Sequence, residues 1–197
     1  LKSRIKDNEA EGVFVGALKL GVVVGLLLIV LGLFGSRKLS LALGADAVTL
    51  PLTQVYMATI LTFAPFFILN NTVLSFVRND NNPKLAMVAM LIGSFSNVLL
   101  DYIFLFPFGM GMFGAAFATS LSPIISLTIL SAHFVAKKQM PAFLKHKMTR
   151  PAVMDILNLG SATFIAEVSS AVVLTTFNLL ILGLEGNRGV AAYGIVA

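Results

Sequence analysis

Long apolar runs, separated by short polar stretches, dominate the chain. The runs cover residues 13–34, 50–77, 85–106, 112–136 and 152–184. Each exceeds the roughly 18–20 residues with which an α-helix crosses the ~30 Å hydrocarbon core of a bilayer. In the last run we interpret residues 152–157 as interfacial and place the membrane span near 158–182. The pattern predicts an all-α fold, a polytopic bundle of transmembrane helices.

Composition agrees with this pattern, because 57% of the 197 residues are apolar and only 12% are charged. The mean hydropathy is +0.93. A soluble domain of this size must cover its surface with polar side chains, so a soluble enzyme is excluded. The chain has no cysteine, which excludes disulfides, thiol nucleophiles and thiolate-bound metals. We therefore expect the lipid bilayer to be its surroundings.

Basic residues are distributed unevenly between the two sides of the membrane that alternating helices define. Residues 1–12, 78–84 and 137–151 share one side and contain ten lysines and arginines, whereas the other side contains three. Basic loops stay in the cytoplasm, which places 37–49 and 107–111 outside. The net charge of +5 is thus a topology signal and not a nucleic-acid-binding surface. We expect a multi-pass protein of the cell membrane.

Carboxylates inside the apolar runs are the first candidates for function, because an ionisable group that faces lipid is costly. Two lie inside the predicted spans, Asp101 and Glu167, whereas Asp46 and Asp80 are interpreted as solvated loop residues. Asp101 shares one helical face with Asn97, one turn earlier, and with Ser94. A polar face at membrane depth points to an ion pathway or to a helix contact.

The following helix brings Thr119 to the same depth, because Asp101 and Thr119 lie ~8 Å and ~10 Å from the loop that joins their helices. Pro123 has no N–H, so the carbonyl of Thr119 lacks its usual helical donor. A hard cation such as Na⁺ prefers oxygen ligands of these kinds, and a carboxylate can instead carry a proton. We interpret Asn97, Asp101 and Thr119 as a cation or proton site. The alternative is a hydrogen-bonded network that only packs two helices.

Glu167 belongs to a second polar stripe, which also contains Thr163, Ser170 and Asn178. So long a stripe is expected to face either a cavity, where Glu167 would take part in coupling, or another helix. Both interpretations remain open. Of the other residues, Pro65 and Pro123 are expected to kink their helices, and the Gly21–Gly25 pair is typical of close helix packing.

The segment 78–84 is interpreted as a tight turn that Pro83 and its asparagines explain without a ligand, and His133 is assigned no role.

Four segments then give the chain a family likeness. They read SFVRNDNNPK at 75–84, SNVLLDYIF at 96–104, GMGMFGAAFAT at 109–119 and GVAAYGI at 189–195. In this order and spacing the chain resembles the multidrug and toxic compound extrusion (MATE) family over nearly its whole length.

The resemblance implies that the five runs are the third to seventh of twelve membrane helices, arranged in two halves of six. Residues 1–136 would belong to the first half, 137–151 would form a basic cytoplasmic linker, and 152–197 would begin the second half. The chain starts at Leu1 and stops within a new apolar run at 190–197. We therefore expect a middle portion of a longer protein, whose next helix is truncated.

The resemblance also implies a function. Members of the family are cation-coupled antiporters that export amphiphilic, often cationic compounds by alternating access, with Na⁺ or H⁺ as the coupling ion and no other cofactor. Asn97 and Asp101 match an Asn and an Asp on the family's fifth helix, and Thr119 matches a Thr on the sixth. Glu167 resembles a carboxylate that some members use on the seventh. Asn81 departs from the family, which commonly has glycine there.

Two other classes of function can be compared with this one. A lipid-linked oligosaccharide flippase of related architecture would need a basic groove for pyrophosphate, and Lys19 is the one basic residue within a predicted span. A membrane-embedded enzyme would need a nucleophile and base, or a metal site, at membrane depth, and the spans offer no such constellation. We expect no enzymatic activity and a transporter that acts as a monomer when complete.

Overall fold

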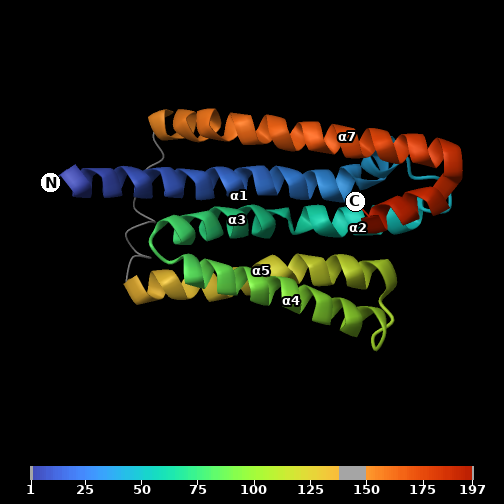
Figure 1. Cartoon of the computed structure of the whole chain (residues 1–197), viewed down its shortest axis with the longest axis horizontal. Helices are drawn as coiled ribbons and strands as arrows, with labels where there is room; N and C mark the ends of the chain where they lie inside the picture. The colour runs from blue at the N-terminus through green and yellow to red at the C-terminus, as the bar shows by residue number, and fades with distance from the viewer. Residues whose placement is uncertain (1, 138–149, 197) are drawn as a thin grey trace.

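The computed structural model describes residues 2–137 and 150–196, which form α-helices joined by short connections (Figure 1). The helices are α1 (Lys2–Ala42), α2 (Leu50–Thr62), α3 (Ala64–Asn79), α4 (Pro83–Leu105), α5 (Gly111–Lys137) and α7 (Arg150–Val196). Four of these described helices are long and apolar enough to cross a membrane, and the bent pair α2–α3 makes a fifth span. The predicted all-α fold is confirmed.

The helices lie roughly parallel to one long axis (Figure 1). α1 packs on α2 and α3, while α5 packs on α2, α3 and α4. α7 lies along α1 at one edge of the bundle, and α4 and α5 form the opposite edge (Figure 1). The N-terminal half of α1, the end of α3 and the end of α5 enclose a buried core. In it the ring of Phe14 stacks on Phe76 and on Phe134, with centroids 4.0 and 5.9 Å away, and these two rings also stack on each other at 6.0 Å.

The span predicted over 50–77 is broken, because α2 and α3 meet at an angle of 49°. The break lies at Phe63, and Pro65 lies in the first turn of α3, where a missing N–H is tolerated. The predicted kink is confirmed, two residues before the proline. α5, by contrast, continues through Pro123 as a single helix, so the kink expected there does not interrupt it.

The close helix packing predicted for the Gly21–Gly25 pair is also present. A Cβ atom added to Gly25 would lie 2.8 Å from the Cα atom of Pro65, and one added to Gly21 would lie 2.8 Å from the side chain of Ile68. Only glycine therefore allows α1 to approach α3 this closely. The first turn of α3, which contains Pro65 and follows the bend, is therefore the part of α3 that packs against Gly25 of α1.

α7 extends beyond the predicted span near 158–182. Gly186 interrupts it with φ 65° and ψ −160°, and the chain turns back at this point (Figure 1). The residues after Gly186 correspond to the new apolar run at 190–197. Residues 138–149, most of the predicted linker 137–151, lie outside the described residues, so the division into two halves stays a prediction.

The connections alternate between the two ends of the bundle, as the predicted topology requires. The α1–α2 connection (43–49), the α4–α5 connection (106–110) and the turn at Gly186 lie at one end, and the α3–α4 turn (80–82) lies at the other (Figure 1). Asn81 in that turn has φ 58°, a left-handed conformation that asparagine tolerates almost as well as glycine.

Candidate functional site

The best-supported candidate site lies between α4 and α5, which are antiparallel neighbours. The connection between them is tight because Gly109 and Gly111 adopt φ values of 59° and 56°. Near the middle of the pair, the Ser122 hydroxyl donates a hydrogen bond of 2.7 Å to the Gly93 carbonyl. A Cβ atom on Gly93 would lie 3.3 Å from the Ser122 carbonyl oxygen. The two helices are therefore in close contact at membrane depth.

Asn97 and Thr119 meet across this interface. The Asn97 Nδ2 donates a hydrogen bond to the Thr119 Oγ1 at 3.3 Å, and both side chains are half-buried. The sequence predicted that Asn97, Asp101 and Thr119 lie together, with Asp101 at the depth of Thr119, and in the structure Asn97 is the residue that bonds to Thr119. Because the amide nitrogen of Asn97 is used in this bond, its carbonyl oxygen is left as an acceptor.

Asp101 lies one helical turn after Asn97 and is half-buried. Its Oδ1 atom is buried, and within the described residues it has no hydrogen-bond partner. A buried acceptor without a partner is costly, and a bound cation or a proton would satisfy it. On the facing helix, Pro123 is buried and offers no N–H to the Thr119 carbonyl. The arrangement collects oxygen atoms suited to Na⁺ or to a proton.

The polar stripe that contains Glu167 lies on α7, away from the α4–α5 site. Thr163, Glu167 and Ser170 are exposed on α7, and Asn178 is half-buried. α7 packs on α1, at the edge of the bundle opposite α4 and α5, so the structure does not bring Glu167 to Asp101 (Figure 1). Whether the stripe faces a cavity or another helix stays a prediction.

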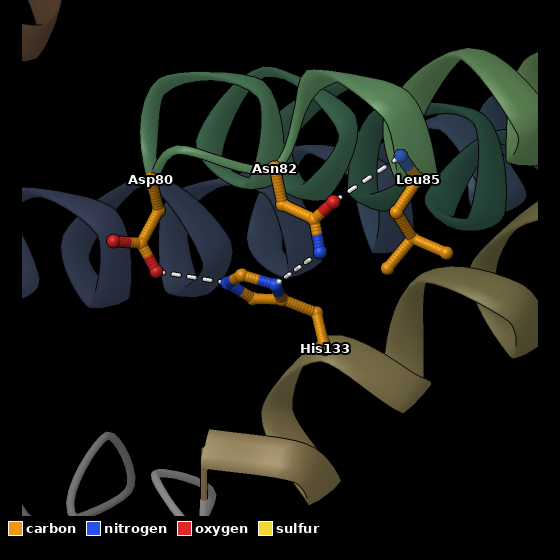
Figure 2. Close-up of polar contacts among 4 residues, drawn as sticks. All are labelled: Asp80, Asn82, Leu85 and His133. Carbon is orange, nitrogen blue, oxygen red and sulfur yellow. Dashed lines mark hydrogen bonds and ion pairs between the residues drawn. The ribbon is translucent and has the colours of Figure 1, made fainter.

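A polar cluster that the sequence interpretation missed lies at the other end of α5 (Figure 2). His133 is buried, and its Nε2 lies 2.8 Å from Oδ2 of Asp80, a carboxylate 30% exposed. The Asn82 Nδ2 lies 3.3 Å from the His133 Nδ1, and the Asn82 Oδ1 accepts a hydrogen bond from the backbone N–H of Leu85. The cluster joins the α3–α4 turn to α5.

These contacts define the protonation of the imidazole. Because the Asn82 oxygen caps α4, its amide group faces the His133 Nδ1, which must accept. The Nε2 then donates to the Asp80 carboxylate. Asp80, interpreted from the sequence as a solvated loop residue, is partly exposed but also pairs with the buried His133, which thus joins the turn to α5. The depth argument used for Asp101 and Thr119, applied to the inner ends of the same helices, could have found this contact.

The chain is similar in sequence and in structure to known membrane transporters. The family model described as MatE matches residues 6–103. The multidrug export protein MepA of Staphylococcus saprophyticus is 28% identical over 177 residues, which cover 89% of this chain and 39% of that protein. The chain thus spans about 39% of the length of the curated relatives it matches.

Solved structures show the same fold. One is the inward-facing conformation of a multidrug resistance MATE family transporter of the MOP superfamily. It aligns with a TM-score of 0.78 at 24% identity and covers 94% of this chain and 48% of that one. Another is the outward-facing conformation of a transporter described in the same words. It aligns with a TM-score of 0.75 at 27% identity and covers 93% of this chain and 42% of that one.

Proposed function

Because the chain belongs to the MATE family of multi-pass membrane transporters, we propose that it forms the central part of a secondary active multidrug antiporter. The complete protein exports amphiphilic or cationic compounds across the cell membrane, as a monomer, in exchange for Na⁺ or H⁺. Its basic loops face the cytoplasm. The export activity is supported by the relatives named as multidrug export proteins.

The observation that carries the coupling proposal is the buried, unpartnered Oδ1 of Asp101 beside the Asn97–Thr119 hydrogen bond. A carboxylate at membrane depth is expensive unless it is paired, protonated or bound to a cation. Na⁺ would be held by oxygen atoms of Asp101, Asn97 and Thr119, and a proton would be held by Asp101 alone.

Coupling follows from the difference between the loaded and the unloaded site. With the ion bound, the charge of Asp101 is compensated and the Thr119 carbonyl has a partner. When the ion leaves, an uncompensated charge favours a different arrangement of α4 and α5. An ion gradient across the membrane can then drive the exchange between inward-facing and outward-facing states that exports a substrate.

The test is the substitution Asp101→Asn in the complete transporter. The amide neither titrates nor balances a cation, so we expect ion-driven export of a fluorescent cationic dye to fall by ~10-fold or more. Export is measured against imposed Na⁺ and pH gradients, with the amount of protein in the membrane matched. Glu185→Gln, which neutralises an exposed carboxylate outside the spans, is the control and should export normally. Export by Asp101→Asn at the rate of the parent would contradict the proposal.

A further inference from the structure

A second polar contact joins segments that are far apart in the sequence, at the end of the bundle opposite the histidine cluster. Asp46 lies in the α1–α2 connection, and Asn187 lies in the turn that follows Gly186. The Asn187 Nδ2 donates a hydrogen bond of 2.7 Å to the Asp46 Oδ2, across 141 positions of sequence. Both side chains are exposed at this end of the molecule.

Asp46 is held ready for this contact by its own loop. Its Oδ1 accepts hydrogen bonds from the backbone N–H groups of Val48 and Thr49, at 3.0 and 2.8 Å, and from the Thr49 hydroxyl at 2.8 Å. The Thr49 Oγ1 in turn accepts from the Asp46 N–H at 3.0 Å, which completes a reciprocal cap before α2. One carboxylate oxygen thus orders the loop, and the other contacts Asn187.

The same hydrogen bonds determine the charge of Asp46. The backbone N–H of Thr49, followed by the amide of Asn187, lowers the pKa of Asp46 from 3.8 to about 2. The carboxylate is therefore ionised at any physiological pH, and the contact with Asn187 does not depend on protonation.

An apolar contact supports the polar one. Gly44, in the same loop, has φ +94° and lies over α7, where an added Cβ would come within 2.9 Å of Leu179 Cδ2 and 3.3 Å of Leu182 Cδ2. The backbone conformation favours glycine at this position, and the loop lies directly against the two leucine side chains. The α1–α2 loop therefore packs on α7 through two separate contacts.

We propose that Gly44, Asp46 and Asn187 form a latch on the outer side of the transporter, which closes the first helical half onto the second. The inference rests on the proposed alternating access and on the predicted assignment of α1 and α2 to one half and α7 to the other. When the outer side opens, the halves must separate and these contacts must break. A single exposed hydrogen bond is weak, which suits a contact that opens in every transport cycle.

The absence of cysteine from the chain makes the latch directly testable. Asp46→Cys and Asn187→Cys are combined in the complete transporter and joined by a short bifunctional thiosulfonate, which a reductant removes. We expect joining to abolish dye export and reduction to restore it, because a permanently closed outer side blocks the cycle. Each single-cysteine variant should export dye at the same rate before and after this treatment.

The outcomes separate the latch from the proposed function. If the joined protein exports dye at the rate of the untreated protein, the latch is wrong, whereas export itself stands. If the parent protein exports no dye, the proposed function is wrong, and a readout that needs no export decides the latch.

That readout is the exposure of Leu182, which lies beneath Gly44. In an Asn187→Asp variant two carboxylates face each other, and their repulsion opens the contact while Asp46 keeps its local hydrogen bonds. A Leu182→Cys reporter should then react with an external impermeant maleimide at least ~3-fold faster than in an Asn187→Gln control, which keeps the amide donor. Equal rates would overturn the latch.

Discussion

At the scale of single residues, two carboxylates of the chain contrast in their surroundings. Asp46 has a donor for each oxygen and is exposed. Asp101 has a buried oxygen without a partner among the described residues. A carboxylate that is already satisfied has little to gain from an ion, whereas one that is not can bind and release it. Of these two carboxylates, Asp101 is therefore the one that we propose as a coupling residue.

This contrast predicts which residue controls the pH dependence of export. A pKa lowered from 3.8 to about 2 means that the stabilising contribution of Asp46 is complete above pH 3.8 and is lost only as the pH falls towards 2. Asp46→Asn should therefore leave the midpoint of the pH profile unchanged between about pH 5 and 8, even where the rate itself falls. The profile is measured as dye export at a series of external pH values. A shifted midpoint would show that Asp46 titrates in this range.

At the scale of helices, prolines and glycines have position-specific effects. Pro65 lies in the first turn of α3 and coincides with a bend of 49°, whereas Pro123 lies inside an uninterrupted α5. The neighbouring helices explain why one proline lies at a bend and the other does not. Gly25 of α1 packs against Pro65 at the bend. Gly93 and Ser122 instead hold α4 against α5 next to Pro123. The same residue type thus bends one span and leaves a free carbonyl in another.

Pro123→Ala tests the second of these effects. The alanine N–H can donate to the Thr119 carbonyl and withdraw it from the ion site, so we expect a reduction of ion-driven export of roughly 3–10-fold, milder than that of Asp101→Asn. Pro51→Ala, in the first turn of α2, is the matched control because a proline in the first helical turn is tolerated without loss of an interior helical bond. Dye export against an ion gradient is compared for both variants. Equal losses in the two would mean that the Thr119 carbonyl is not involved.

Gly25→Ala tests the α1–α3 contact. The new methyl group would lie 2.8 Å from the Pro65 Cα, and backbone cannot move aside as a side chain can. We expect the free energy of unfolding to fall by about 1–3 kcal/mol, the usual effect of overpacking. The measurement is thermal unfolding in detergent. Gly12→Ala, where nothing lies within 4 Å of the added Cβ, should unfold like the parent; a similar decrease in both variants would contradict the explanation.

At the scale of the whole molecule, the structure separates the connections into two sets at opposite ends, and charge assigns each set a side. The α4–α5 connection contains no charged residue, whereas the α3–α4 turn is flanked by Arg78 and Lys84. By the positive-inside rule, we propose that the second set faces the cytoplasm. The proposed latch lies with the first set and the histidine cluster with the second.

This sidedness can be measured with single cysteines in the cysteine-free chain. Phe108→Cys, in the exposed α4–α5 connection, should react with an impermeant maleimide in intact cells. Lys84→Cys should react only after permeabilisation, because its side of the membrane is sealed from the reagent. Reaction of position 84 in intact cells would reverse the proposed orientation.

Much of this fold follows from local patterns. Runs of apolar residues predicted the helices, and equal depth in antiparallel helices was enough to bring Asn97 to Thr119. The contact of His133 with Asp80 was missed because the depth argument was applied only to groups inside the apolar runs. The contact of Asp46 with Asn187 could not be predicted, because it depends on how α7 packs against α1 across 141 residues. Long-range packing of apolar helices leaves few traces in sequence periodicity.

The histidine cluster also has a consequence for biosynthesis. Asp80 and Asn82 are synthesised 53 and 51 residues before His133, so their shared bonds cannot form until α4 has crossed the bilayer and α5 has returned. At ~5–20 residues per second this interval lasts about 3–10 s. During it the α3–α4 turn is at the membrane surface without its imidazole. The cluster can therefore close only once the α4–α5 hairpin is complete.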